Sequence, residues 1–439
     1  MGSSPGSSHH RSCGWRLLES QLSCNVFARV TVIRKRRMTG LLDGVTVIEA
    51  AVLLTGDYFG MLLADEGADV VKIESPGLGD YIRDHMGAIA PHNSPYHLFV
   101  NRNKKSVTLD MKHPDARDVF ARLVERADVF ITGFTAGTPA RLGMGYEDVR
   151  AIKPDIVYAQ ATGFGARGPY ATMPTHGLMM NALVGSPKLE MHDGHVRAAP
   201  GNGGGGNQGV VVGPLFAAYA VAAALFRRER TGAGAYIDVA CSDAVLATSW
   251  PGSAITRNAA RVEPVAMSPM FAGGVAARYA YYETGDGKFI LFCPEEHKFW
   301  QRFCELIDRP DLLAKDDPTV VADFGEDVEL WDELQRIFHT RTQAEWVADF
   351  LALGIPGAPA LRPDDLGDDP HLRARGILVD EHHPVAGEFH TFASPVLVDG
   401  EEFSIRVPAP ALGEHTDEVL ADLGYDATAI ADLRARGVV

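Results

Sequence analysis

Apolar runs and amphipathic stretches alternate along the first half of the chain. Val45–Ala51 is apolar and rich in β-branched residues, which predicts a strand, and Phe59–Glu66 carries apolar residues at helical spacing, which predicts a helix. The same patterns predict further strands at 68–73, 106–110, 128–132, 155–160 and 236–241, and helices at 114–126 and 215–230. Such alternation predicts an α/β fold built on a doubly wound parallel sheet.

Ligands of doubly wound sheets bind at the carboxyl ends of the strands. Here those ends are the turns at 53–57, 74–77 and 133–138, so we expect a small-molecule site there. The glycine run Gly201–Gly206 loosely fits a dinucleotide-binding spacing, but no predicted strand precedes it and no helix opens on it. It therefore predicts a flexible loop.

Composition and charge narrow the class of protein. With 439 residues, 46% of them hydrophobic, the chain has enough apolar material for a large core and two structural regions. The 57 acidic against 41 basic residues argue against nucleic acid or an anionic membrane surface as a partner. No apolar run is predicted to reach the length of a membrane span, since Leu215–Leu225 is too short. We therefore expect a soluble protein with a small-molecule ligand.

The five cysteines form neither a CxxC pair nor a spaced Cys/His set, so neither a metal site nor a disulfide framework is indicated and a reducing, cytoplasmic location is expected. Residues 1–37 differ in composition from the remainder, because they hold seven basic residues against the single acid Glu19. This extension resembles a transit peptide. It also fits a start codon placed too far upstream, with Met38 as the true first residue, because the folded pattern begins directly after it.

Several short motifs follow one another from the first predicted strand to the C-terminus: Leu42–Glu49, Leu63–Glu74, Asn101–Ser106, Arg228–Gly234, Gly354–Pro359 and Leu412–Thr416. In this order they resemble the family III CoA-transferases, the CaiB/BaiF group that includes formyl-CoA transferases and α-methylacyl-CoA racemases. The resemblance implies a Rossmann-like large domain built from both chain ends (38–240 and 385–439), a smaller α+β domain at 260–362, and linkers at 241–259 and 363–384. It also implies an interlocked dimer, either of two identical chains or with a related subunit.

The resemblance further implies that coenzyme A, as an acyl-CoA, binds at the turns of the large domain. Backbone amides at a helix start and one arginine suit phosphate groups, and two apolar side chains can enclose an adenine. For the apolar members, ordinary core packing is the alternative explanation. The implied CoA contacts are Leu53, Leu54, Thr55, Ser75, Leu109, Gly133, Phe134 and Arg141.

Family transferases use an aspartate before an alanine-rich helix, which attacks the acyl-CoA carbonyl and forms a mixed anhydride. The resemblance places Val210 at that position, or Gly209 with a one-residue shift, and neither residue can be a nucleophile. The carboxylate that the family often carries in an upstream loop is replaced by Gly177. The ordinary transferase cycle therefore lacks its nucleophile.

In the racemase branch, a histidine matching His176 and a glutamate matching Glu296 act from opposite faces of the substrate. Moving a proton at the carbon beside a thioester needs a base on one face and an acid on the other. The resemblance therefore implies His176 and Glu296 as candidate catalytic residues. A lone loop histidine is also a common structural residue, and Glu295–Lys298 is typical of an exposed helix start.

Three functions stay open on the sequence. Family membership predicts an acyl-CoA:carboxylate CoA-transferase, in which Asp57, Glu190 or Asp193 would replace the missing aspartate. One alternative is a racemase or isomerase of 2-methylacyl-CoA type that uses His176 and Glu296. The other is a non-catalytic CoA-binding subunit of a heterodimeric CoA-transferase.

Overall fold

The computed structural model describes residues 40–185, 189–198, 208–258, 260–261 and 276–439. The basic extension and the glycine run Gly201–Gly206 lie outside the described residues. So does the segment 262–275, near the start of the predicted small domain.

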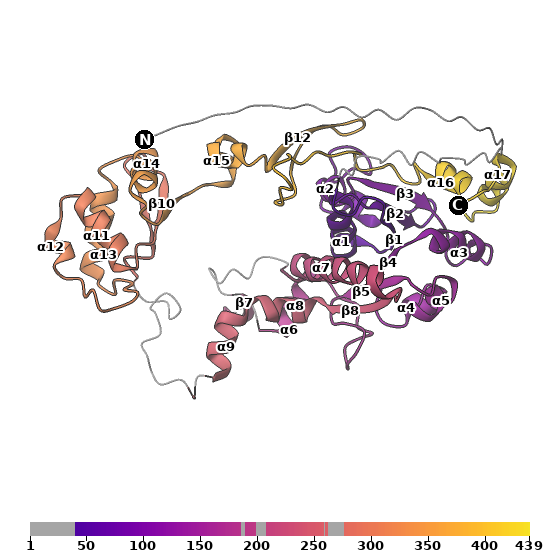
Figure 1. Cartoon of the computed structure of the whole chain (residues 1–439), viewed down its shortest axis with the longest axis horizontal. Helices are drawn as coiled ribbons and strands as arrows, with labels where there is room; N and C mark the ends of the chain where they lie inside the picture. The colour runs from indigo at the N-terminus through magenta and orange to yellow at the C-terminus, as the bar shows by residue number, and fades with distance from the viewer. Residues whose placement is uncertain (1–39, 186–188, 199–207, 259, 262–275) are drawn as a thin grey trace, which may run out of the picture. The chain divides into compact units, whose positions relative to one another are not determined.

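Six parallel strands form the main sheet, in the order β3-β2-β1-β4-β5-β8 (Figure 1). The doubly wound sheet predicted from the sequence is confirmed. The strand order reverses between β1 and β4, and a crevice at such a reversal is where ligands of these folds bind. The strands are β1 (Thr46–Ala50), β2 (Asp69–Glu74), β3 (Lys104–Thr108), β4 (Val129–Thr132), β5 (Val157–Thr162) and β8 (Ala235–Ala240).

Helices cover both faces of this sheet, because alternate residues of each strand point to opposite sides. Val47 of β1 packs with α1 (Leu53–Asp65) and α7 (Gln208–Thr231). Its neighbour Ile48 belongs to the core of the other face. The C-terminal helices belong to the core on this other face, so both ends of the described chain build the region. Its helices are α3 (Ala116–Arg126), α5 (Tyr146–Ile152), α16 (Thr416–Asp422) and α17 (Ala427–Ala435).

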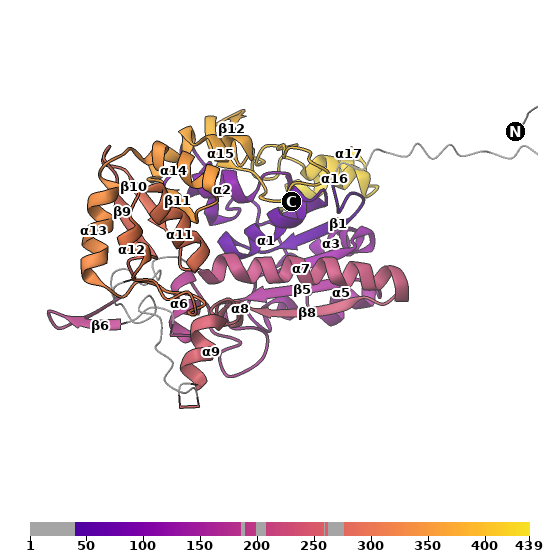
Figure 2. The ribbon, with the colours of Figure 1, turned by 60° about the vertical axis from the view of Figure 1, so that its left-hand side comes forward.

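The helix α7 is longer than the predicted helix 215–230, because it begins at Gln208 and continues through Pro214. Among the described residues it is the one helix long and apolar enough to cross a membrane, contrary to the expectation that no apolar run reaches that length. It nevertheless packs against α1 and the sheet, where Ala217 and Val221 are fully buried (Figure 2). Its apolar composition therefore has an explanation in the core.

A second core lies in residues 277–355 and is dominated by aromatic side chains such as Phe292, Phe338 and Trp346. An antiparallel sheet of β9 (Ala280–Glu283), β10 (Phe289–Phe292) and β11 (Gly357–Ala360) carries the helices around it. This is the predicted smaller α+β region; its exact boundaries stay a prediction. Its helices are α11 (His297–Leu306), α12 (Pro310–Leu313), α13 (Val328–Phe338) and α14 (Gln343–Leu353).

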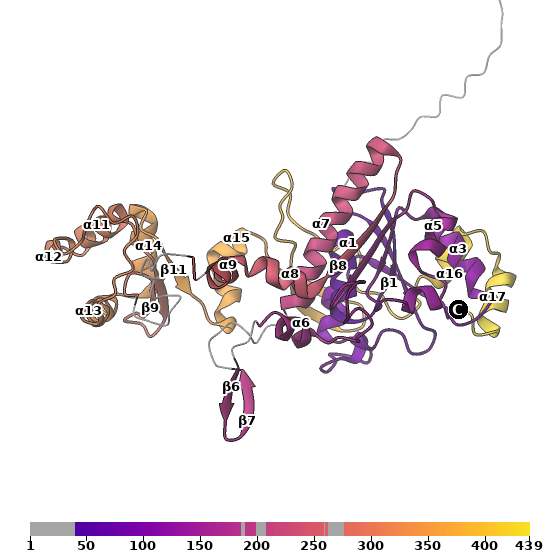
Figure 3. The same cartoon turned by 90° about the horizontal axis from the view of Figure 1, so that it is seen from below.

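The chain also forms shorter elements, among them the hairpin of β6 (Leu189–His192) and β7 (His195–Ala198) shown in Figure 3. A second hairpin pairs β12 (Leu378–His383) with β13 (Gly387–Phe392). The remaining helical elements are η1 (Tyr81–Asp84), α2 (Pro95–Val100), α4 (Thr138–Arg141), α6 (Gly177–Leu183), α8 (Cys241–Thr248), α9 (Trp250–Asn258), η2 (Pro363–Asp368) and α15 (Pro370–Ala374).

A cluster of five buried charges, called here the buried charge cluster, lies between α1 and the strands β1, β2 and β3. Its members are at most 2% exposed. Lys72 Nζ lies 3.1 Å from Glu49 Oε1, 2.5 Å from Asp57 Oδ1 and 3.0 Å from Asp80 Oδ2. Lys104 Nζ lies 2.8 Å from Glu49 Oε2. Each charge thus has an opposite charge within hydrogen-bonding distance, as burial requires.

Gly60 of α1 makes room for the buried charge cluster. A Cβ atom at this position would lie 1.7 Å from Glu49 Oε2 and 3.0 Å from Lys104 Nζ. We expect Gly60→Ala to lower the free energy of unfolding by about 1 to 3 kcal/mol, the usual cost of overpacking a filled core. Urea denaturation measures it. The matched control is Gly367→Ala, because no atom lies within 4 Å of a Cβ built there and its change should be small.

Candidate active site

The turn between β1 and α1 stands where the strand order reverses. Val52 is the N-cap residue of α1, and Leu53 has a φ of 60°, a left-handed conformation that leucine rarely adopts. Its N–H donates to both carboxylate oxygens of Asp80, at 3.2 Å and 3.0 Å. The amides of a first helical turn have no partner inside the helix, so those of Leu54 and Thr55 suit an anionic or carbonyl oxygen of a ligand.

A cavity of about 630 Å³ opens beside this turn. It brings together residues from the ends of β1, β4 and β5 with the segment before α6 and the start of α7. Its walls are mostly apolar, and its side-chain polar groups are hydroxyls and imidazoles. The residues that line this cavity are Val52–Gly56, Tyr81, His85, Gly133–Thr135, Ala161–Gly163, Pro174–Met180 and Val210.

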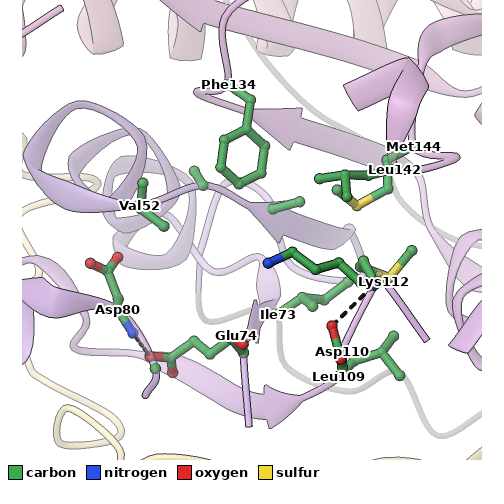
Figure 4. A pocket seen from close by; sticks show the side chains of 15 residues that line it. Val52, Ile73, Glu74, Asp80, Leu109, Asp110, Lys112, Phe134, Leu142 and Met144 are labelled. Carbon is green, nitrogen blue, oxygen red and sulfur yellow. Dashed lines mark hydrogen bonds between the residues drawn. The ribbon is translucent and has the colours of Figure 1, made fainter. Parts of the chain in front are cut away.

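A smaller cavity of about 260 Å³ lies at the carboxyl ends of β2 and β3. Figure 4 shows Phe134 and Leu109 on opposite sides of it, with the side chain of Lys112 reaching across. Val52 and Phe134 line both cavities, so the two adjoin. The smaller cavity is lined by Ala50–Val52, Ile73–Ser75, Gly79, Asp80, Leu109–Lys112, Phe134, Leu142 and Met144.

Most of the residues predicted to bind CoA line these two cavities. The larger one holds Leu53, Leu54, Thr55, Gly133 and Phe134. The smaller one holds Ser75, Leu109 and Phe134. Arg141 is different, because its exposed side chain donates to Thr138 Oγ1 at 2.9 Å and lines neither cavity, although the next residue, Leu142, lines the smaller one.

The structure places the two predicted catalytic residues on different elements. His176, exposed and directly before α6, lines the larger cavity. Glu296 is the N-cap residue of α11, in the region with the second core, and lines neither cavity. His176 is thus a neighbour of the predicted CoA turn, whereas nothing in the described structure joins Glu296 to it.

Val210 stands on the first turn of α7, not on a loop before the helix. It lines the larger cavity and packs with Met180, Cys241 and Leu54. A Cβ at Gly209 would lie 2.7 Å from Met180 Sδ, so a larger residue there would collide with the wall instead of facing the cavity. Val210 therefore occupies the position from which a side chain reaches the site.

No carboxylate lines the larger cavity among the described residues. Asp57 is fully buried, paired with Lys72 and accepts a hydrogen bond from Asn101 Nδ2 at 3.0 Å, so it is not available as a nucleophile. Glu190 and Asp193 belong to the exposed β6–β7 hairpin, where Asp193 lies 2.9 Å from His192. The predicted replacement of the missing aspartate by Asp57 has no support in this geometry.

Several cavity residues were missed by the sequence analysis. Lys112 follows the end of β3, and its position after a predicted strand was the signal that could have found it. Tyr81 begins η1 and His85 directly follows it; the contact of both residues with the cavity depends on the tertiary fold, which no local pattern reveals. Thr162 ends β5; its hydroxyl is buried and has no hydrogen-bond partner in the described structure. A buried polar group without a partner is uncommon in folded proteins.

Burial and charge shape the titration of the groups below the turn. Burial raises the pKa of Asp57, and it raises the pKa of Asp80 to about 6 with a further contribution from the charge of Asp57. Burial opposes the charge of Lys72, but Asp57, Asp80 and Glu49 raise its pKa well above the ordinary value. Lys72 thus stays charged and holds the surrounding carboxylates together.

The sequence profile described as CoA-transferase family III matches residues 42–416, which is most of the chain. The chain belongs to CoA-transferase family III. It is 34% identical over 404 residues to succinyl-CoA:mesaconate CoA-transferase of Haloarcula hispanica, covering 88% of this chain and 97% of that protein. Succinyl-CoA:glutarate CoA-transferase of Homo sapiens is 29% identical over 404 residues, covering 91% of this chain and 90% of that protein.

Solved structures share the fold of this family III chain. A CaiB/BaiF family protein from Brucella suis is 27% identical with a TM-score of 0.67, covering 88% of this chain and 99% of its own. Rv3272 from Mycobacterium tuberculosis is 27% identical with a TM-score of 0.71, covering 87% and 99%. The predicted family, the fold class and a CoA-transferase type of enzyme are thereby confirmed, and CoA thioesters are the substrates of such enzymes.

Proposed function

We propose that this family III enzyme binds an acyl-CoA across the two cavities and transfers its CoA to a carboxylic acid held in the larger one. The adenine fits between Leu109 and Phe134, and the Lys112 ammonium is placed to meet a phosphate. Because Val52 and Phe134 line both cavities, the pantetheine can pass from one to the other. The thioester then lies near the first turn of α1.

The observation that carries the mechanism is the larger cavity, which holds His176 and Val210 but no carboxylate among the described residues. We infer transfer within a complex of both substrates. The acceptor carboxylate attacks the thioester carbonyl, and CoA leaves as a thiolate while a mixed anhydride of the two acids forms. The thiolate then attacks the acceptor's carbonyl, which gives the new thioester and releases the donor acid as a carboxylate. One carboxylate enters and one leaves, and the mixed anhydride joins the two substrate acids, so this route acylates no protein group.

Both steps place negative charge on a carbonyl oxygen, so donors that face that oxygen lower the barrier. The first-turn amides of Leu54 and Thr55 are one set. The unpaired hydroxyl of Thr162 and the imidazole of His176 are further groups among the polar side chains that line the cavity. These groups allow the chain to stabilise the reacting carbonyl without the family aspartate.

Calorimetric titration with CoA and with several acyl-CoA thioesters tests binding. We expect Lys112→Ala and Arg141→Ala each to weaken CoA binding by about 1.5 to 3 kcal/mol, because each removes a charged donor near the smaller cavity. The matched control is Arg150→Ala, an exposed arginine on α5 that contacts Glu147. If the wild-type protein bound none of these compounds, the proposed function would fail.

Hydroxylamine trapping tests for an acylated protein group. With acyl-CoA present, we expect no hydroxamate on the wild-type chain, and initial rates should show the intersecting pattern of a sequential mechanism instead of parallel ping-pong lines. Val210→Asp places a carboxylate in the cavity and should give a hydroxamate at position 210, which serves as the positive control. A hydroxamate on wild-type Glu190 or Asp193 would instead establish a substitute nucleophile.

The position of His176 in a cavity without described carboxylates also favours a second candidate, an α-proton isomerase of acyl-CoA thioesters. In heavy water such an enzyme exchanges the α-proton of a 2-methylacyl-CoA even when net turnover is slow. Exchange without CoA transfer would select the isomerase. Tight CoA binding with neither reaction would select the non-catalytic subunit, and co-purification with a related chain would then be examined.

A further inference from the structure

Two walls of the larger cavity meet at one buried carboxylate. Leu53 belongs to the wall formed by the β1–α1 turn, and Tyr81 and His85 belong to the wall formed by η1. Leu53 holds its left-handed conformation, which a β-carbon makes unfavourable, so an interaction must hold it there. The hydrogen bond that joins these two walls runs from the Leu53 N–H to Asp80, which are 27 residues apart in the sequence.

Asp80 provides the hydrogen bonds that join the two walls. Its carboxylate, in a residue only 1% exposed, accepts the Leu53 N–H at 3.2 Å and 3.0 Å and the Ile82 N–H at 3.0 Å. The hydrogen bond from the Ile82 N–H caps the start of η1. Lys72 Nζ donates to Oδ2 at 3.0 Å, and the same ammonium donates to Ala51 O at 3.0 Å, just before the turn. One carboxylate thus fixes both walls, and one ammonium fixes the carboxylate to the strand end.

We propose that Asp80 is a positioning residue, which holds Leu53 left-handed and η1 in place so that the first-turn amides of α1 face the CoA thioester. It acts through Leu53 and η1 and needs no contact with the reacting atoms. This inference rests on the proposed function for the identity of the ligand. The hydrogen bond between Leu53 and Asp80, which joins the two walls, can be tested by amide hydrogen exchange without any ligand.

Charged groups surround Asp80 from every element packed against it. Lys72 and Glu74 come from β2, Asp57 from α1, Glu49 from β1, Lys104 from β3 and Arg83 from η1. Burial raises the pKa of Asp80 to about 6, so its charge is present at pH 8 and lost by pH 5. An asparagine at this position resembles the protonated acid in shape and charge.

The affinity for CoA is the first measurement. We expect Asp80→Asn to raise the Kd about 10- to 100-fold at pH 8, the effect of losing charged hydrogen bonds. The gap between the two proteins should close as the pH falls to 5, because wild-type Asp80 is then protonated as well. The phosphates of CoA titrate in the same way with both proteins, so their effect cancels in the ratio. The matched control is Asp84→Asn, on the same element but exposed and paired with His92.

Amide hydrogen exchange is the second measurement and needs no CoA. Asp80→Asn should speed exchange at Leu53 by tenfold or more, while strand β3 keeps its protection. Leu53→Gly, which enters a left-handed conformation freely, should reduce the further effect of Asp80→Asn on CoA affinity in a double-mutant cycle. A wild-type protein that bound no CoA, with exchange at Leu53 still dependent on Asp80, would overturn the proposed function only. Unchanged exchange at Leu53, or a Kd ratio that stays constant from pH 8 to 5, would overturn the positioning role.

Discussion

Lys72→Met is expected to lower the free energy of unfolding by about 3 to 5 kcal/mol at pH 7.5, because removing one partner of a buried ion pair leaves the other charges uncompensated. Lys72 is the cation shared by Glu49, Asp57 and Asp80, all of which are at most 1% exposed. Methionine matches the volume of lysine closely, so the loss reports charge and hydrogen bonds more than packing. Urea denaturation followed by circular dichroism measures it.

The pH dependence of this loss has a defined sign. Asp80 has a pKa of 3.8 in its ordinary state and about 6 in the fold, so the native state binds more protons between these values. Its contribution to the free energy of unfolding therefore falls as the pH rises from about 4 to 6. Without Lys72, the pKa of Asp80 rises further and the carboxylates become protonated more readily. The deficit of Lys72→Met should thus be smaller at pH 5 than at pH 7.5.

Glu74 does not interfere in this range. Burial opposes its charge, but hydrogen bonds from Arg83 and the charge of Lys72 lower the pKa of Glu74 to about 2, so its stabilisation is lost only below pH 4.5. Lys105→Met on the neighbouring strand is the matched control. That lysine is partly exposed and lies 3.5 Å from Asp69 and Glu418, so its removal should cost less than about 1 kcal/mol. A deficit equal to this control would show that the buried charge cluster is already neutral in the fold.

Most strands of the main sheet could be predicted because short, mostly apolar runs recur between turns and helical stretches. Val129–Thr132 and Val157–Thr162 lie within one or two residues of their predicted bounds. The carboxyl ends of these strands meet at one edge of a parallel sheet, so the ligand turns could be predicted with them. The order of motifs supplied the family, which neither periodicity nor composition reveals.

The starts of α1 and α7 could not be predicted, because the first depends on a distant partner and the second runs against a local rule. The helix α1 begins at Leu53, six residues before the apolar spacing becomes helical, since Asp80 holds the Leu53 N–H from another part of the chain. The helix α7 begins before Pro214, a residue that usually ends helices. This error also placed Val210 on a loop instead of on the helix that carries it into the cavity.

The roles of individual acids were the least predictable part of the site. Asp57 follows the CoA turn and was therefore a candidate nucleophile. In the structure its carboxylate is buried and accepts hydrogen bonds from Lys72 and Asn101. These partners lie 15 and 44 residues away in sequence, so only the tertiary fold reveals the pairing. Asp80, by contrast, received no role from the sequence, although its carboxylate organises two cavity walls.

His176→Gln is expected to lower the turnover number by about two to four orders of magnitude, the usual range for a positioned acid–base or polarising group. Glutamine keeps similar size and a hydrogen-bonding end but cannot carry the proton. Because His176 lines the cavity beside the proposed thioester position and not the adenine cavity, CoA affinity should change less than about threefold. Transfer to a carboxylate and α-proton exchange in heavy water are both measured. Whichever reaction the wild type performs should be lost.

His382→Gln is the matched control for this substitution, since that histidine is exposed on β12 and pairs with Glu388 at 2.9 Å. If His176→Gln retained full turnover, His176 would be only the residue that precedes α6. The other imidazole of the larger cavity, His85, would then be the group to replace. The other outcome is a loss of turnover in His176→Gln but not in His382→Gln, with CoA binding and the free energy of unfolding preserved. That result would place the chemistry where the β1–α1 turn, the end of β5 and the start of α6 meet. That is the junction that Val210 also reaches.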